Sequence, residues 1–127
     1  MNTDGTPPDR LTQRVIGCAI AVSNRLGAGF VERVYENALA HKLRKAGLAI
    51  AQQRGLTVVY DGVVVGAYVV DLLVEERVIV ELKAVRALDT VHQAQCINYL
   101  RVTGLPVCLL LNFGRPRLEV KRFAGRT

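Results

Sequence analysis

The hydrophobic residues of this chain change their spacing along its length, and this change limits the fold more than any other feature. They recur at helical spacing from Asp9 or Thr12 to the glycine-rich break at residues 27–29, and again over residues 30–45. The pattern then alternates in steps of two, which is typical of strands, and helical spacing returns over residues 89–102. The chain therefore combines helices and strands in one continuous order.

The strand-like part of the sequence divides into five stretches. The predicted strands are residues 56–60, 63–74, 78–83, 105–113 and 118–123. Asp61-Gly62 predicts a tight hairpin turn between the first two. The almost continuous apolar run at 105–113 is typical of a strand buried on both faces, and we expect 118–123 at a sheet edge. The order ααβββαββ predicts an α/β fold with a mixed sheet flanked by helices.

Composition limits the chain further. A length of 127 residues, half of them hydrophobic, fits one domain, which we place at residues 10–127 after a polar tail at residues 1–9. No uncharged apolar run approaches the ~20 residues of a membrane helix, and the N-terminus lacks the apolar part of a secretory signal. Three widely spaced cysteines are expected to be buried free thiols: Cys18, Cys96 and Cys108. We therefore expect a cytoplasmic protein without a membrane partner.

Acidic side chains inside the apolar strands point to chemistry. Asp71 lies within a run of valines and leucines, and Glu81 lies in the next predicted strand. Carboxylates are rarely buried without a partner or a metal ion. If residues 75–77 form a three-residue hairpin loop, Val74 pairs with Val78, and Asp71 lies opposite Glu81 on one face of the sheet. A two-residue loop would instead place the two acids on opposite faces.

Two facing carboxylates repel each other, so a positive group is expected between them. A divalent cation meets this requirement, because two carboxylates with a backbone carbonyl and water make an oxygen site that suits Mg²⁺. Lys83 shares the face of Glu81 and could orient an attacking water or stabilise charge on a phosphate. The alternative is a salt bridge from Lys83 to one of the two acids on a solvated sheet face.

Polar positions on the predicted helices could belong to the same site. Glu32 and Glu36 are four residues apart on the second helix, although stabilisation by the helix dipole alone could explain Glu32. Gln95 and Tyr99 are also four apart and share one face with His92. A partly exposed polar stripe is the alternative for that face. We interpret His92 as a partly buried helix residue rather than a ligand or base.

The charge balance favours an acidic partner. The chain has 17 Lys and Arg against 11 Asp and Glu, a net charge of +6, and nucleic acid is the obvious partner for such a protein. Arg86 follows the lysine strand, and Arg115 and Arg117 belong to a basic stretch after Asn112. We expect these three arginines to contact phosphates. A solvated loop arginine and a solubilising edge strand with its tail are the alternatives.

Asp71, followed by Glu81-Leu82-Lys83, resembles the D…(D/E)-x-K signature of the PD-(D/E)XK nuclease superfamily. The resemblance covers residues 10–123, which is nearly the whole chain. One position departs from the pattern, because Val70 stands where the superfamily's name has proline.

Further motifs add to this resemblance. Residues 29–35, with Gly29, Glu32 and Tyr35, are similar to the G-x-x-E-x-x-Y motif of a bacterial family in that superfamily, as are residues 78–84 and 109–114. Residues 95–99 resemble the Q-x-x-x-Y motif of the RecB-like branch. The four motifs occur in the order and at the spacings that these families show.

The resemblance implies a restriction-endonuclease-like core that cuts phosphodiesters with Mg²⁺ or Mn²⁺. It implies a catalytic set of six residues: Glu32, Asp71, Glu81, Lys83, Gln95 and Tyr99. Asp71 and Glu81 would be metal ligands, and the Leu82 carbonyl could add another. Glu32 would complete or orient the metal shell.

The same resemblance makes Lys83 the catalytic lysine, with Gln95 and Tyr99 positioning the lysine, the water or the scissile phosphate. We therefore expect a Mg²⁺-dependent nuclease, with DNA as the expected substrate. The alternative is a non-catalytic nucleic-acid- or protein-binding module on the same fold, and a small-molecule phosphohydrolase is a third option. The exposed edge strands of a small domain also leave a homodimer open.

Overall fold

The structure is a computed structural model that describes residues 8–125 of the chain. These residues form three helices and five strands in the predicted order, so the α/β class with a mixed sheet flanked by helices is confirmed. The elements are α1 (Pro8–Leu26), α2 (Glu32–Lys45), β1 (Ile50–Tyr60), β2 (Val63–Val74), β3 (Val78–Lys83), α3 (Thr90–Thr103), β4 (Val107–Asn112) and β5 (Glu119–Ala124). Residues 1–7 of the predicted tail lie outside the described residues, and residues 8 and 9 belong to α1.

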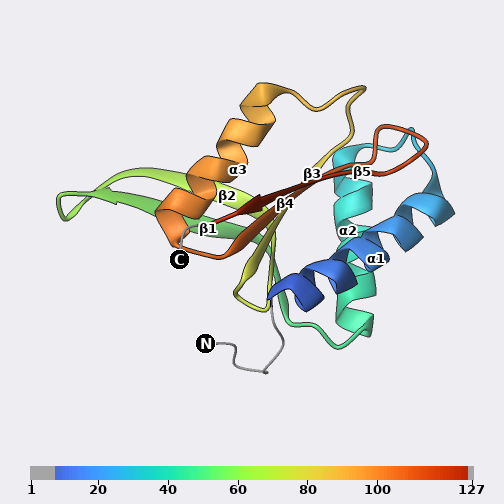
Figure 1. The fold of residues 1–127 in the computed structure, drawn as a ribbon, viewed down its shortest axis with the longest axis horizontal. Helices are drawn as coiled ribbons and strands as arrows, with labels where there is room; N and C mark the ends of the chain where they lie inside the picture. Colours follow the sequence, from blue (N-terminus) through green and yellow to red (C-terminus); the bar gives the residue numbers. More distant parts are fainter. Residues whose placement is uncertain (1–7, 126–127) are drawn as a thin grey trace.

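The five strands form one sheet in the order β1-β2-β3-β4-β5 (Figure 1). β3 and β4 are parallel because α3 crosses from the end of one to the start of the other, and all other neighbours are antiparallel. All six residues of β4 are buried, as predicted from their continuous apolar sequence. β5 lies at one edge of the sheet, also as predicted, and β1 lies at the other.

The helices cover the two faces of the sheet and create two cores. α1 and α2 pack on one face and α3 on the other (Figure 1). Along β3, Val80 and Leu82 join the core beneath α1 and α2, whereas Ile79 joins the core beneath α3. Because side chains alternate along a strand, Glu81 and Lys83 lie on the α3 side.

Several predicted boundaries differ from the structure: β4, for example, is Val107–Asn112 instead of residues 105–113. Two of the differences lie next to the site described below. β1 begins at Ile50 instead of residue 56, because polar residues of its first half pair with β2, as in Gln52 opposite Leu72. Tertiary pairing overrides the polar pattern there. α2 begins at Glu32 rather than at residue 30, since Val31 is still extended and forms the N-cap.

β1 and β2 extend well beyond the rest of the sheet. β2 pairs with β3 only over Leu72–Val74, whereas its pairing with β1 continues to the turn, where Tyr60 is opposite Val63. We call residues 55–70 the hairpin arm; it projects from the body of the protein (Figure 1). The Asp61-Gly62 turn has φ angles of 53° and 76°, which confirms the predicted tight turn.

The three cysteines are free thiols, as expected. Cys96 and Cys108 are buried, and Cys18 is half-buried on α1. None of the described helices combines the length and the apolar character that crossing a membrane requires.

Candidate functional site

The predicted three-residue loop at residues 75–77 and the pairing of Val74 with Val78 are confirmed. The backbone ladder between β2 and β3 ends at the pair formed by Leu72 and Val80, so Asp71 and Glu81 lie just beyond it. From that point β2 follows β1 into the hairpin arm, while β3 stays with β4. The two acids therefore lie where the strands diverge, and we call this place the fork.

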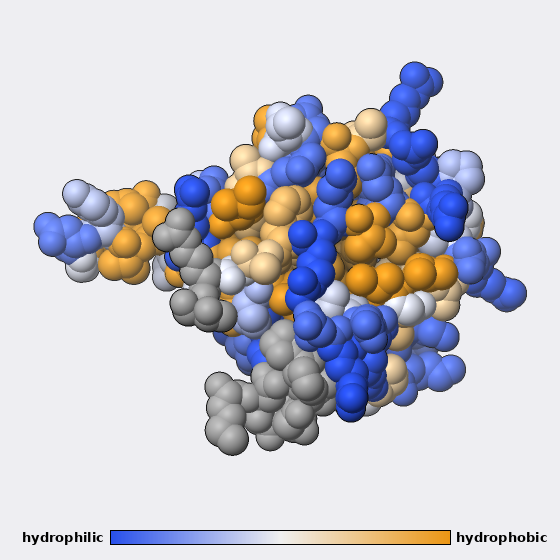
Figure 2. Space-filling model, viewed as in Figure 1, coloured by the Kyte–Doolittle hydropathy of each residue, from blue (hydrophilic) through white to orange (hydrophobic). Residues whose placement is uncertain are grey.

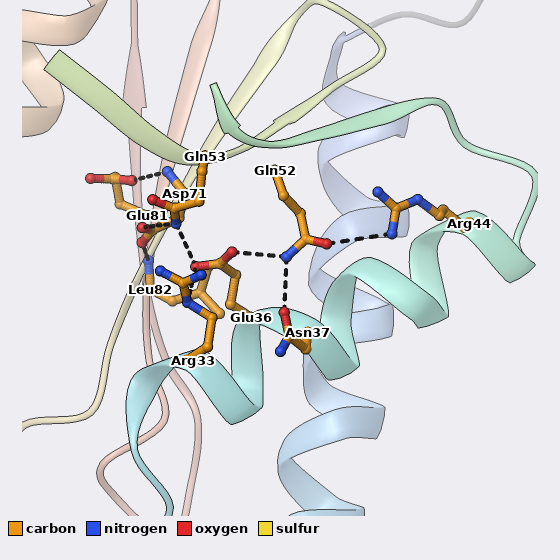
Figure 3. Close-up of polar contacts among 9 residues, drawn as sticks. All are labelled: Arg33, Glu36, Asn37, Arg44, Gln52, Gln53, Asp71, Glu81 and Leu82. Carbon is orange, nitrogen blue, oxygen red and sulfur yellow. Dashed lines mark hydrogen bonds and ion pairs between the residues drawn. The ribbon is translucent and has the colours of Figure 1, made fainter. Parts of the chain in front are cut away.

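At the fork, carboxylates take over the role of backbone acceptors (Figure 3). The Asp71 N–H donates to Oε2 of Glu81 at 2.7 Å, and the Leu82 N–H donates to Oδ2 of Asp71 at 2.8 Å. Each carboxyl group is thus oriented through one oxygen by a hydrogen bond from the backbone. The second oxygen of each carboxylate accepts no backbone hydrogen bond among residues 8–125, and Oδ1 of Asp71 accepts from Nε2 of Gln53 at 3.3 Å.

Glu81 has the most strongly perturbed carboxylate at this site. Burial, followed by the nearby charge of Asp71, raises the pKa of Glu81 to about 8. The hydrogen bond from the Asp71 amide and the charge of Lys83 act in the opposite direction. Without a cation, Glu81 therefore holds a proton at neutral pH, and a bound cation would relieve the repulsion that keeps the proton there.

Lys83 lies on the same face of β3 as Glu81, as predicted from strand alternation. Its side chain is half-buried and its charge reaches Glu81. Within residues 8–125 it forms no ion pair, so the salt bridge that we considered as an alternative is not observed in that part of the chain. The ammonium is therefore available to a negatively charged substrate.

α3 places Tyr99 over the fork. Tyr99 is buried, and burial together with the charge of Glu81 and a hydrogen bond to it raises the pKa of the Tyr99 hydroxyl. Gln95 is half-buried one turn earlier, and no hydrogen bond joins it to the fork within the described region. His92 instead completes a capping box, where its Nδ1 accepts from the Asp89 N–H, which confirms our interpretation of His92 as a helix residue.

Glu36 and Gln53 extend the site to α2. The sequence analysis considered Glu36 for the site but left it out of the catalytic set, and it did not consider Gln53. Nε2 of Gln53 donates to Oε1 of Glu36 at 2.8 Å and to Oδ1 of Asp71 at 3.3 Å (Figure 3). The other Glu36 oxygen accepts from Gln52 at 2.8 Å, and Arg33 forms an ion pair with Glu36 at 3.6 Å. One amide thus connects a buried helix carboxylate to the fork.

A signal for Glu36 was present in the sequence, whereas none was present for Gln53. Glu36 lies three, four and seven residues before Leu39, Ala40 and Leu43, so it shares the buried face of α2. Gln53 has a φ of 52°, a left-handed conformation that is uncommon outside glycine and that no sequence pattern here reveals.

Glu32 lies beside the end of β3. Its exposed carboxylate accepts from the N–H of Ala84 at 3.3 Å, one residue after Lys83. Tyr35, which is three residues later in the same motif, is buried, donates to the Gly27 carbonyl at 2.5 Å and stacks on Phe113. Tyr35 therefore holds the turn that leads into α2, and this turn places Glu32 near the lysine.

The three arginines that we predicted to contact nucleic acid are exposed and lie on two loops: Arg86, Arg115 and Arg117. Asn112, which is fully buried, ties these loops together. Its Oδ1 accepts from the N–H groups of Val85 and Gly114, and its Nδ2 donates to the Val85 carbonyl. A Cβ at Gly114 would lie 2.3 Å from the Val85 carbonyl oxygen, so only glycine permits this approach.

The donor set at the fork fits a Mg²⁺-like ion. Within residues 8–125, no three His, Cys, Asp or Glu side chains gather into a metal-binding group, so the protein offers the two carboxylates of Asp71 and Glu81. Mg²⁺ is commonly bound by one or two carboxylates, with water and substrate phosphate as its other ligands. Hard oxygen donors of this kind suit such an ion.

Comparison with known proteins agrees with this geometry. The sequence model of the PD-(D/E)XK nuclease superfamily matches residues 9–123, from the first turn of α1 into β5. No curated protein and no solved structure matches the chain. The mixed sheet flanked by helices is consistent with the restriction-endonuclease-like fold that we expected. The chain therefore belongs to the PD-(D/E)XK nuclease superfamily.

Proposed function

We propose that this protein is a metal-dependent nuclease that hydrolyses phosphodiester bonds, with Mg²⁺ or Mn²⁺ as its ion and DNA as its expected substrate. The proposal is carried by one observation: two carboxylates converge at the fork, and the ammonium of Lys83, which has no ion pair within residues 8–125, lies on the same face of β3 as Glu81. Membership of a superfamily of nucleases supports it. The free thiols favour a reducing, cytoplasmic setting.

The fork carboxylates would hold the ion through the oxygens that accept no backbone hydrogen bond. When bound, a divalent cation lowers the pKa of a coordinated water and neutralises charge on the phosphate. The Leu82 carbonyl is the further ligand that the superfamily resemblance implies. Glu32 would orient the shell from the end of β3, where it accepts from Ala84.

Lys83 would stabilise the negative charge that develops on the phosphate. Tyr99, whose hydroxyl pKa is raised by burial and by the charge of Glu81, would orient Glu81 as a metal ligand. Gln95, one turn away on α3, would contact the water or the phosphate. The motifs around Glu32 and Gln95 favour the G-x-x-E-x-x-Y family and the RecB-like branch as the chain's place within the superfamily.

Binding of nucleic acid would rely on phosphate contacts. Arg86, Arg115 and Arg117 lie on the tied loops at the end of β3 and β4, close in sequence to Lys83 and Asn112. Aromatic residues make up only 6% of the chain, which provides few platforms for base stacking. We therefore expect weak sequence preference.

A cleavage assay on linear and circular DNA and on RNA, in Mg²⁺, Mn²⁺ or EDTA, tests the proposal. Asp71→Asn removes a charge but keeps an oxygen that can accept from the Leu82 N–H, so this link between β2 and β3 is retained. We expect Asp71→Asn and Lys83→Ala each to reduce cleavage at least about 100-fold. Asp61→Asn and Lys45→Ala remove the same charges at exposed positions outside the site and should retain activity.

Two results would contradict the proposal. Binding of nucleic acid without metal-dependent cleavage would favour the non-catalytic module. Hydrolysis of free nucleotides without cleavage of either DNA or RNA would favour a small-molecule phosphohydrolase. Thermal unfolding of each variant shows whether a loss of activity comes from a loss of folding.

A further inference from the structure

The hairpin arm exposes an unusual amount of apolar surface. Its large apolar residues have exposed fractions between 49% and 74%: Val59, Tyr60, Val63–Val65, Tyr68 and Val69. Figure 2 shows apolar side chains along the arm where it leaves the body of the protein. Monomeric soluble proteins rarely leave a contiguous apolar area of several hundred Å² in water.

The two faces of the arm differ. On the side of α3, Leu56 packs against the core beneath that helix, and Tyr68 contacts Tyr99 edge to face at 5.8 Å. The other side, which we call the open face, has no such cover. Six exposed residues form it in three cross-strand pairs: Gly55 with Val69, Thr57 with Ala67, and Val59 with Val64. The open face is therefore flat, small-sided and without charge.

The arm also has two unpaired strand edges. β1 is the last strand of the sheet, and β2 loses its second neighbour beyond Leu72. A two-stranded hairpin is only marginally stable in water unless it packs on further structure. Lysine and proline on an edge strand usually block pairing with another chain. Neither residue occurs between Gly55 and Val70.

The charge of the arm favours a second copy of the chain as its occupant. Asp61 is the only charged residue between Gly55 and Val70, so the arm has no cation for a phosphate backbone. A second arm is equally apolar, and a two-fold axis would pair each open face with its own copy. Three large apolar residues of the open face are more than half exposed: Val59, Val64 and Val69.

We propose that the hairpin arm is the interface of a homodimer, in which the open faces of two copies of this chain pack against each other. The proposal does not depend on nuclease activity. Sedimentation equilibrium at micromolar concentration should give the wild-type protein twice the chain mass of 13.9 kDa. Val64→Lys and Val69→Lys place like charges on both sides of the interface and should restore the mass of a single chain.

Val91→Lys is the matched control, because Val91 is 69% exposed on α3, outside the arm. It should remain dimeric. Hydrogen exchange provides a second measurement: amides of residues 58–69 should become more protected as the wild-type concentration rises, and should not in Val64→Lys.

Three outcomes would overturn the proposal. The first is a wild-type protein that sediments as a single chain at all concentrations. The second is a dimer that Val91→Lys weakens as much as Val64→Lys does. The third is a wild-type monomer that binds neutral phosphatidylcholine vesicles through the arm, which would assign this surface to a membrane instead.

Discussion

Gln53 combines an unusual backbone conformation with hydrogen bonds to two carboxylates of the site. It adopts a left-handed φ of 52°, which costs a non-glycine residue about 1–2 kcal/mol. In return, its single amide contacts Glu36 on α2 and Asp71 at the fork. Strained residues of this kind are concentrated at functional sites. We infer that Gln53 positions Asp71 and does not itself contact substrate.

Replacing Gln53 should therefore weaken metal binding without abolishing the fold. For Gln53→Ala we expect the Mg²⁺ concentration that gives half-maximal cleavage to rise roughly 10-fold, because ligand-orienting partners typically contribute that much. Gln52→Ala is the matched control, since Gln52 also donates to Glu36 but has no contact with Asp71. Equal shifts in the two variants would show that the link to Asp71 is unimportant.

Glu81 makes the stability of the metal-free protein depend on pH. Its pKa is about 8 in the fold, against an ordinary value of 4.5. Because the folded state holds this proton more tightly than the unfolded chain, the contribution is fully present below pH 4.5 and is lost as pH rises through 8. In EDTA, the wild type should lose stability relative to Glu81→Gln by up to a few kcal/mol over this range.

Urea unfolding at a series of pH values measures this difference. Mg²⁺ should restore stability at high pH to the wild type but not to Glu81→Gln, because the cation then replaces the proton. A flat difference between the two proteins from pH 5 to 9 would contradict the assignment of the raised pKa to Glu81.

At the scale of the elements, the end of β4 organises the loops around the lysine. Asn112 pairs with Lys83 in the ladder between β3 and β4, and its side chain then binds both loops that follow these strands. It also donates to Glu119 at the start of β5. One buried amide therefore fixes the loop that bears Arg86 and the loop that bears two further arginines.

Asn112→Ala should destabilise the fold by roughly 2–4 kcal/mol, because it leaves the N–H and the carbonyl of Val85 without their partner. Asn98→Ala removes the same side chain at an exposed position on α3 and should cost less than about 0.5 kcal/mol. Urea unfolding midpoints of the two variants provide the comparison. A small effect at Asn112 would show that water readily replaces its hydrogen bonds.

Strands could be predicted from the sequence where an apolar run coincides with a strand that is buried in the sheet. The bounds of β2 and β3 match the apolar runs, and the three-residue loop between them follows from the polar residues at 75–77. The first half of β1 could not be predicted, because Gln52 and Gln53 become strand residues only by pairing with β2 and contacting α2. Both side chains donate to Glu36, and Gln53 also donates to Asp71.

At the scale of the whole molecule, charge and apolar surface are separated. The chain carries a net charge of +6, whereas the hairpin arm has one acidic residue and no basic residue. The arginines proposed to bind phosphate lie instead on the loops after β3 and β4. We infer that nucleic acid and a second copy of the chain use different parts of the protein.

The combined variant Arg115→Ala/Arg117→Ala should weaken DNA binding and make it less dependent on salt. The slope of log affinity against log salt concentration should fall by about 1 for each phosphate contact that is lost. Lys45→Ala is the control, because Lys45 is at the end of α2 opposite to Glu32, ~20 Å along the helix. A similar change in slope for Lys45→Ala would indicate that DNA is attracted by the overall positive charge and not by a defined set of arginines. Fluorescence anisotropy over a salt series measures both slopes.

Because β2 diverges from β3 at the fork, two backbone amides donate to carboxylates, and their hydrogen exchange can report on the state of these carboxylates. The amide hydrogens of Asp71 and Leu82 are shielded by the same carboxylates that are expected to bind the ion. Any event that reorients either carboxylate must change how fast these two hydrogens are replaced by deuterium. Two peptide groups can therefore record whether the two carboxylates hold an ion, in a molecule that carries no tryptophan to serve as an optical probe.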